Sequence, residues 1–316
     1  MDPMDRIRSR MPLADLNIGK QHLLSKVIGK RFAAAPPHPR AGLVEIVNLD
    51  RLDAKSRFLG PNGFGYVTNF VRYASKSLEE LWQTVENNLD NAIAACSDRS
   101  IFDHPKHVRT IKDAIALHLV RSVHTRPFLD DLWTKNLDAL RSRFLDSHRD
   151  LLAAEFTKRY GLVPGGPECL EMMLDEALAP HLALKKADAY FRDSLERLFE
   201  LARTNLDARG LEVSTPATGE FLIGDAPAIA VGNDGRLGLL GGVGVNTAKT
   251  IALPLGPRLL ASTGDTDNFL VLDPEGTAHV NQWQVSSAAS RAFCRPGSGL
   301  ATVIRQSAQV RSTSAV

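Results

Sequence analysis

The chain has 316 residues, of which 44% are apolar, and its 38 Lys and Arg against 36 Asp and Glu leave a formal net charge of +2. This is the composition of a globular protein with an ordinary core. Because the two signs are mixed along the chain, no global field favours nucleic acid or an anionic membrane. We therefore expect no strong nucleic-acid signal and no membrane partner. Cofactors, other partners and the oligomeric state stay open.

The start of the chain and its cysteines bear on the compartment. Residues 1–10 alternate charges and lack the apolar core of a signal peptide, and no run approaches the ~20 apolar residues of a membrane helix. These features favour a cytoplasmic protein. The three cysteines lie far apart and outside any Cys-x-x-Cys pattern, so neither a disulfide framework nor a structural zinc site is indicated.

The first organised segment is expected after an N-terminal arm of residues 1–19. The apolar residues of 20–32 approximate one helical face, which predicts a short amphipathic helix with His22 at its start. The segments 43–49 and 64–71 are rich in β-branched and aromatic residues. We expect them to form two strands.

A helical insertion of about four helices is predicted at about 78–209. Ser77, with a Glu three residues later, has the pattern of a capping box that opens the first helix. Prolines and glycines mark the expected breaks, after Pro127, near Pro180, and at Gly210, where a left-handed residue would close the last helix. The remaining helices are expected at about 107–123, 128–160 and 168–209.

Beyond residue 210 the pattern changes to short apolar runs punctuated by glycine, which predict strands. These runs are 211–213, 221–223, 229–231, 251–253 and 269–272. Helical spacing returns over 280–293, and the polar tail 306–316 is expected to be disordered. Since an isolated hairpin is marginal, we expect the N- and C-terminal strands to pair into one mainly antiparallel sheet. The chain is then a single α+β domain over 20–305, with the helices inserted.

One apolar run leads directly into a carboxylate. Phe221–Ile223 are followed by Gly224 and Asp225, and Pro227 removes a ladder donor just beyond them. Asp225 is therefore expected where a strand ends. From that position a carboxylate can take part in chemistry, or it can cap a turn of its own backbone.

Two other motifs do not indicate a ligand. The glycine-rich stretch 241–250 resembles a phosphate loop, but Ala248 stands where the Walker A pattern needs Gly. A flexible hairpin or lid is favoured over nucleotide binding there. His104 and His107 lie three residues apart near a loop with no third ligand close in sequence, so a metal site is not expected.

Polar and apolar motifs follow one another in a fixed order between residues 20 and 293. They are Gln21–Lys26 with Arg31–Phe32, Asn69–Phe70, Leu78–Glu79 with Glu86, Arg121, Thr125–Pro127, Phe221–Pro227, Leu253–Pro257 and Asn281. In this order they resemble a bacterial family catalogued as domain of unknown function 4238. Members begin with His-Tyr-Val-Pro or a close variant, whereas His22 is followed here by Leu-Leu-Ser. The resemblance implies an architecture and a set of recurring polar residues, but no settled reaction.

Three of these residues are expected to be catalytic: His22, Asp225 and Glu86. His22 has the side chain whose unperturbed pKa lies near neutrality. Asp225 can orient or charge the imidazole, and Glu86 supplies a second carboxylate. A histidine with an acid is the minimal general acid/base pair.

Three more residues are expected to bind substrate: Arg121, Arg126 and Asn281. The arginines can clamp a phosphate or carboxylate, and Asn281 belongs to the set through the resemblance. Two function classes follow. The first is a hydrolase-like enzyme acting on a phosphate-containing or other anionic substrate, with His22, Arg126 and Asp225 in one shared cluster. The second is a non-enzymatic binding or interaction protein in which that cluster is structural and the helical region or the loop 232–250 contacts a partner.

Overall fold

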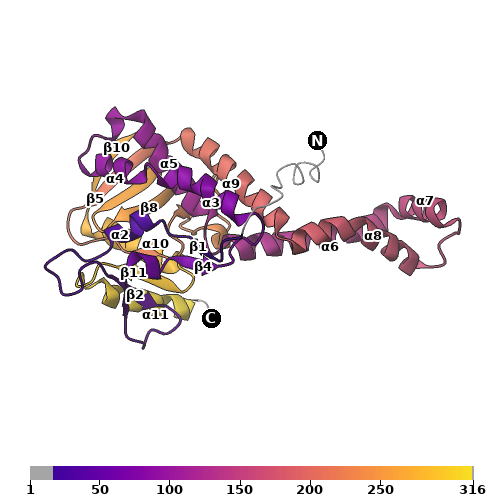
Figure 1. Cartoon of the computed structure of the whole chain (residues 1–316), viewed down its shortest axis with the longest axis horizontal. Coiled ribbons are helices and arrows are strands. Elements are labelled where there is room, and N and C mark those ends of the chain that lie inside the picture. Colours follow the sequence, from indigo (N-terminus) through magenta and orange to yellow (C-terminus); the bar gives the residue numbers. More distant parts are fainter. Residues whose placement is uncertain (1–16, 315–316) are drawn as a thin grey trace.

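Strands from both ends of the chain meet in one sheet of the computed structural model, which describes residues 17–314 (Figure 1). This sheet has the order β3-β2-β11-β6, and all its pairs are antiparallel. Its strands are β2 (Val44–Asn48), β3 (Arg57–Leu59), β6 (Ile223–Gly224) and β11 (Arg291–Cys294). The N- and C-terminal parts of the chain therefore do pair, through β2 and β11. The arm predicted for residues 1–19 lies almost wholly outside the described residues.

β11 lies in a stretch that the sequence predicts to be helical, and this prediction is wrong at its C-terminal end. The helix α10 spans Pro274–Ser287, and the backbone is extended at Ala288, with φ −65° and ψ 140°. The Asp225 carboxylate accepts hydrogen bonds from the backbone N–H groups of residues 289, 290 and 291. A continued helix would need these donors. Their capture by Asp225 ends the helix and sets the start of β11.

A separate five-stranded sheet is formed by the C-terminal part of the chain alone. Its order is β10-β5-β9-β8-β7, antiparallel except for the parallel β10–β5 pair. The strands are β5 (Gly210–Pro216), β7 (Ile229–Val231), β8 (Thr250–Gly256), β9 (Leu259–Gly264) and β10 (Asn268–Leu272). A third sheet pairs β1 (Lys20–His22) with β4 (Tyr66–Thr68). The expectation of one sheet is wrong, because the tight β8–β9 hairpin lets the C-terminal strands pair among themselves.

The helical region contains seven α-helices rather than about four. They are α3 (Ser75–Glu86), α4 (Leu89–Ser97), α5 (Pro105–Val120), α6 (Thr125–Ser147), α7 (Arg149–Tyr160), α8 (Pro167–Lys186) and α9 (Ala189–Asp207). Pro127 lies in the first turn of α6, where its missing N–H costs no intrahelical bond. The last break falls at Asp188, which has a left-handed φ of 70°. Pro180 lies inside α8.

The capping box predicted at Ser77 and the helix end predicted at Gly210 are both wrong. Ser77 lies inside α3, whose N-cap is Ala74, so no capping box opens this helix. Gly210 begins β5 instead of closing α9. A Cβ atom at Gly210 would lie 2.3 Å from the backbone of Thr266, so glycine is needed for this close approach rather than for a left-handed turn.

The N-terminal segment is divided between a strand and a helix. The single helix predicted over 20–32 is replaced by β1 and the shorter α2 (Lys26–Arg31). The Ser25 side chain accepts the N–H of Val27 and so caps α2. His22 consequently lies at the end of a strand and not at the start of a helix.

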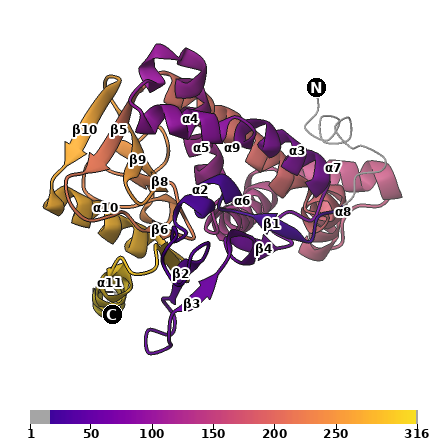
Figure 2. The ribbon, with the colours of Figure 1, turned by 60° about the vertical axis from the view of Figure 1, so that its left-hand side comes forward.

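Most helices cover the two faces of the five-stranded sheet. The helices α6, α7 and α8 form a projecting arm. The main core joins α2, α3, α4, α5 and α9 to one face of that sheet, and α10 packs on the other face (Figure 2). α6 and α8 run side by side away from this body, with α7 at their far end (Figure 1). None of the helices within residues 17–314 is long and apolar enough to cross a membrane.

The C-terminal tail is helical, so the disorder predicted from residue 306 is wrong as far as Ser314. The helix α11 spans Leu300–Ser314. Ile304 and Ala308 are buried in the cluster formed with the four-stranded sheet. The Arg305 guanidinium donates to the carbonyl oxygens of residues 52 and 54. These anchors hold a segment whose composition alone does not predict order.

Candidate functional site

His22 closes β1 opposite Tyr66 of β4, whose ring meets the imidazole edge-on with centroids 5.8 Å apart. Burial, together with the charges of Lys26 and Arg121, lowers the pKa of His22 below its usual value of 6.5. The imidazole is thus neutral at neutral pH and able to accept a proton. Its Nδ1 is buried and has no hydrogen-bond partner in the described part of the chain.

A buried ion pair lies beside His22. Arg121, at the C-cap of α5, is 1% exposed, and its guanidinium lies 2.5 Å from the carboxylate of Glu86 at the end of α3. Burial alone would raise the pKa of Glu86, but the charge and hydrogen bond of Arg121 outweigh it and lower the pKa. The carboxylate is therefore ionised and compensates the buried guanidinium. The structure thus brings together His22, Glu86 and Arg121 of the predicted set.

Glu79 belongs to the same cluster but was not among the predicted site residues. Burial raises its pKa, against the opposing charge of Arg121. Its spacing of seven residues from Glu86 places both carboxylates on one face of α3, two turns apart. The sequence could have revealed Glu79 through this spacing, and through its place in the family-like motif Leu78–Glu79 with Glu86.

His118 supports this cluster structurally. It is 0% exposed, accepts the N–H of Ser25 through Nε2, and lies 2.7 Å from the carbonyl oxygen of Ala114 through Nδ1. Because a carbonyl can only accept, Nδ1 carries the proton and the ring is neutral. Burial, with the nearby charge of Arg121, lowers the pKa of His118 to about 4.

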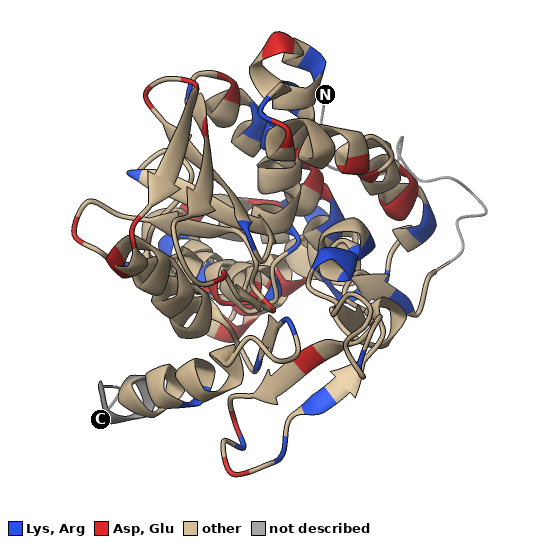
Figure 3. Cartoon of the chain, turned by 90° about the vertical axis from the view of Figure 1, so that its left-hand side faces the viewer, with Lys and Arg blue, Asp and Glu red and all other residues tan. Residues whose placement is uncertain are grey.

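Three buried polar atoms of this cluster have no hydrogen-bond partner among the described residues: His22 Nδ1, Glu79 Oε1 and Arg121 Nε. Buried polar groups nearly always have partners. Three such atoms, two of them on groups whose pKa the charge of Arg121 influences, mark this cluster as a candidate site. Basic and acidic residues are both spread over the ribbon of the chain (Figure 3).

Arg126 has partners of a different kind. Its guanidinium forms two hydrogen bonds, of 2.7 and 2.6 Å, with the carboxylate of Asp188, and it also donates to the carbonyl oxygen of Phe70. It stacks over the ring of Phe191 at 3.9 Å from the centroid. Arg126 thus fastens the start of α6 to the turn before α9, and its partners here are not members of the His22 cluster.

Asp225 and Asn281 also bind the backbone. Asp225 accepts three backbone N–H groups and the Ser290 hydroxyl, so its oxygens cap the turn before β11. The side-chain amide of Asn281 accepts the N–H of Leu222 and donates to the carbonyl oxygen of Glu220. The structure therefore gives both residues a positioning role beside β6, with partners other than His22.

A large apolar pocket lies elsewhere, between the α5–α6 junction, α9 and the loop that joins β7 to β8. It has a volume of about 480 Å³. The glycine-rich stretch 241–250 lies in the connection between two antiparallel strands, β7 and β8, and residues of this connection between 238 and 246 supply one wall. The apolar lining comes from all these segments: Leu119, Val120, Phe128, Leu198, Leu201, Ala202, Ala226, Ala228, Ile229, Ala230, Leu239, Val243 and Val245.

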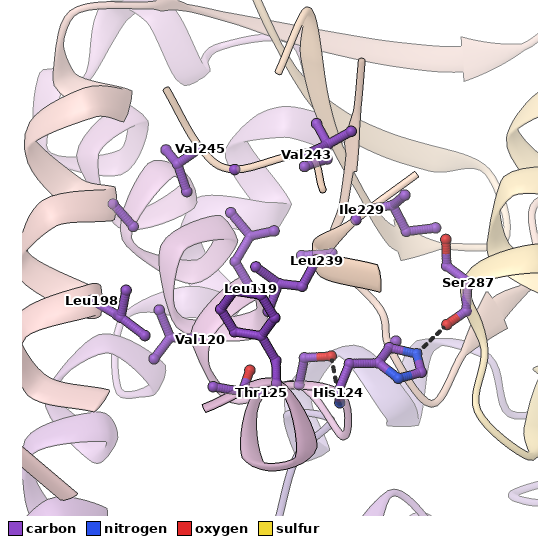
Figure 4. Close-up of a pocket in the computed structure, with 18 of the residues that line it drawn as sticks. Leu119, Val120, His124, Thr125, Leu198, Ile229, Leu239, Val243, Val245 and Ser287 are labelled. Atoms are coloured by element: carbon purple, nitrogen blue, oxygen red, sulfur yellow. Dashed lines mark hydrogen bonds between the residues drawn. The ribbon is translucent and has the colours of Figure 1, made fainter. Parts of the chain in front are cut away.

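Polar groups at the start of α6 and the end of α10 also line this pocket. His124 Nε2 lies 2.6 Å from the carbonyl oxygen of Ser287, so it carries the proton of that hydrogen bond (Figure 4). The hydroxyl oxygens of Thr125 and Ser287 are buried and have no partner in the described chain. The sequence singled out the loop 232–250 as a possible partner contact but did not predict the pocket, because its other walls come from segments that look like ordinary core.

Comparison of the chain with protein-family models, with curated proteins and with solved structures finds no match. The family resemblance therefore stays a prediction carried by the motifs themselves. Function has to be argued from the geometry of the two sites.

Proposed function

We propose that the protein binds a largely apolar small molecule in the pocket between α6, α9 and the β7–β8 loop. The observation that carries this proposal is a pocket of about 480 Å³ with a mainly aliphatic lining. Ligand sites in proteins typically measure about 300–1,000 Å³, and combine such a lining with a few polar groups. This is the second of the two function classes, with the loop 232–250 as part of the binding surface.

The physical argument is one of unfilled packing. Protein interiors are close-packed, and a void lined by apolar side chains forfeits dispersion contacts. Leu201, at the rim of the pocket, is 57% exposed. An apolar ligand would supply the missing contacts and remove this surface from water, which is the usual source of affinity in such sites.

Titration with a neutral fluorescent dye, 1-N-phenylnaphthylamine, tests the proposal. We expect saturable binding of one dye per chain. Leu201→Glu places a charge at the rim without disturbing the core, and should weaken binding roughly tenfold or more, about 1.4 kcal/mol. Thr204→Glu, at an exposed position of the same helix outside the pocket, serves as the control. Absence of saturable binding, or equal weakening by both substitutions, would contradict the proposal.

A second candidate function is supported by the unpartnered atoms of the His22 cluster. We propose for it hydrolase-like acid/base chemistry on a phosphate-containing or other anionic substrate. His22 would act as the base, and Glu86 would hold the Arg121 guanidinium, whose buried Nε–H would donate to the substrate. Lys26 is exposed beside the imidazole and adds positive charge. Asp225, Arg126 and Asn281 act in this proposal as structural residues.

Hydrolysis of p-nitrophenyl phosphate and bis(p-nitrophenyl) phosphate tests this second candidate. The wild-type protein should release nitrophenolate, and His22→Gln should abolish the release while leaving the melting temperature nearly unchanged. His38→Gln, at a histidine bonded only to its own loop, provides the control. No turnover by the wild type, or equal turnover by His22→Gln, would count against acid/base chemistry at His22.

A further inference from the structure

We infer that the ligand of the apolar pocket is a neutral amphiphile, a hydrocarbon body carrying one uncharged hydroxyl or carbonyl group. This inference rests on the proposed binding function and specifies the ligand class. It follows from which polar groups line the pocket, where they lie, and which of them lack partners.

The lining contains no charged side chain among the described residues. Its polar members are hydroxyls, side-chain amides and one imidazole: Ser122, His124, Thr125, Asn205, Asn246 and Ser287. A buried carboxylate or phosphate is stable only with a cation or several donors directed at it. Arg126, which follows Thr125 in the chain, is already paired with Asp188. An ionised ligand group would therefore be uncompensated here.

Two hydroxyls are available for an uncharged group. Thr125 is 0% exposed, and its Oγ1, like the buried Oγ of Ser287, has no partner in the described chain. They come from different elements, the first turn of α6 and the last residue of α10. A hydroxyl both donates and accepts, so either can bond a ligand hydroxyl or carbonyl without any change of charge.

The other polar groups beside them are already engaged. His124 Nε2 is bonded to the Ser287 carbonyl oxygen, and the His124 N–H points to the Ser122 hydroxyl at 3.4 Å. In Figure 4, Thr125 and His124 lie at the bottom of the pocket and Ser287 at its right, while Leu198, Val243 and Val245 lie at the left and the top. Each partnerless hydroxyl therefore stands beside a mainly apolar lining, which suits a molecule with a polar group on an apolar body.

Competition for the bound dye at pH 8 distinguishes the ligand classes. Octan-1-ol, octanoate and 1-fluorooctane share one chain and differ in the end group. We expect octan-1-ol to displace the dye at a concentration at least tenfold below that of octanoate. It should also displace the dye better than 1-fluorooctane, whose fluorine cannot donate a hydrogen bond. Because octan-1-ol and 1-fluorooctane share the octyl chain, the ratio of their displacing concentrations reports mainly on the end group.

Variants then assign this preference to the hydroxyls. Thr125→Val and Ser287→Ala keep the shape of the wall, and each should reduce the alcohol-to-fluoride preference several-fold. Thr134→Val, which removes an exposed hydroxyl from the same helix α6, should leave the preference unchanged. Melting temperatures of the two pocket variants should not fall, because the hydroxyls they remove have no protein partner to lose.

The possible failures are separable. If the dye binds but octanoate displaces it as well as octan-1-ol, the neutral-ligand inference is overturned while the binding function stands. The same holds if both pocket variants keep the full alcohol preference. If no dye binds saturably, the binding function itself fails, and the inference fails with it.

Discussion

Arg126 and Asp188 form a two-pronged ion pair across the base of the α6–α8 arm. Their side chains are 22% and 8% exposed, so each charge depends on the other for compensation. Asp188 also accepts the backbone N–H of Arg72. A residue expected to bind substrate is thus the fastening between the arm and the body.

Removing the acid of this pair should destabilise the protein strongly. We expect Asp188→Ala to lower the free energy of unfolding by about 3–5 kcal/mol, because it leaves the Arg126 guanidinium partly buried and unpaired. Urea unfolding followed by circular dichroism measures the loss. Glu80→Ala, which breaks the exposed pair with Lys76, should cost less than about 1 kcal/mol. Similar small losses in both variants would show that the pair is not needed.

His118 should make stability depend on pH. The unfolded chain protonates this histidine below about pH 6.5, but burial keeps the ring neutral in the folded state until about 4. The free energy of unfolding should therefore fall as the pH is lowered through this window, by at most about 3 kcal/mol. Unfolding at a series of pH values should show a flatter dependence for His118→Gln. An identical slope in the variant would exclude His118 as the cause.

Asp225 should prove structural. We expect Asp225→Ala to lower the free energy of unfolding by about 3 kcal/mol, because three backbone N–H groups and one hydroxyl lose their acceptor. Asp225→Asn, which keeps one acceptor oxygen, should lose less. Thermal and urea unfolding of the two variants provide the comparison. A fully stable Asp225→Ala protein would reopen a chemical role for this carboxylate.

Gly210 should tolerate no side chain. A Cβ atom there would lie 2.3 Å from backbone atoms of Thr266, so Gly210→Ala must shift the start of β5 and should cost about 1–3 kcal/mol. Gly60 has φ −69° and open space around its Cβ position. Gly60→Ala should therefore be neutral or slightly stabilising, by up to about 1 kcal/mol. Equal melting temperatures for the two variants would contradict the close approach at Gly210.

The α+β class and most strands could be predicted from the sequence, because runs such as 44–48 and 250–256 carry a clear β-branched and apolar signal. The pairing of the strands into sheets could not be predicted, since it depends on tight connections such as the turn between β8 and β9. β11 was hidden for a related reason. Its residues continue a helical spacing, and a carboxylate more than sixty positions earlier ends that helix.

The candidate site was predicted in part. His22, Glu86 and Arg121 were selected for their chemistry and do lie in one cluster. Asp225 and Asn281 have equally suitable chemistry, but backbone groups of distant segments satisfy them, and no local pattern reveals such partners. The apolar pocket left no sequence signal beyond the glycine-rich loop 232–250, because Thr125 and Ser287 become unusual only when the fold buries them without partners.

The arm has a mechanical consequence for the pocket. Thr125 in the pocket wall and Arg126 in the fastening are neighbours in the first turn of α6, from which the arm extends far beyond the body (Figure 1). The base of the arm therefore adjoins a wall of the pocket that we propose binds a ligand. A partner that bound the arm and displaced this wall would change the affinity of the pocket for its ligand. By thermodynamic reciprocity, an occupied pocket would then change the affinity of the arm for that partner by the same factor.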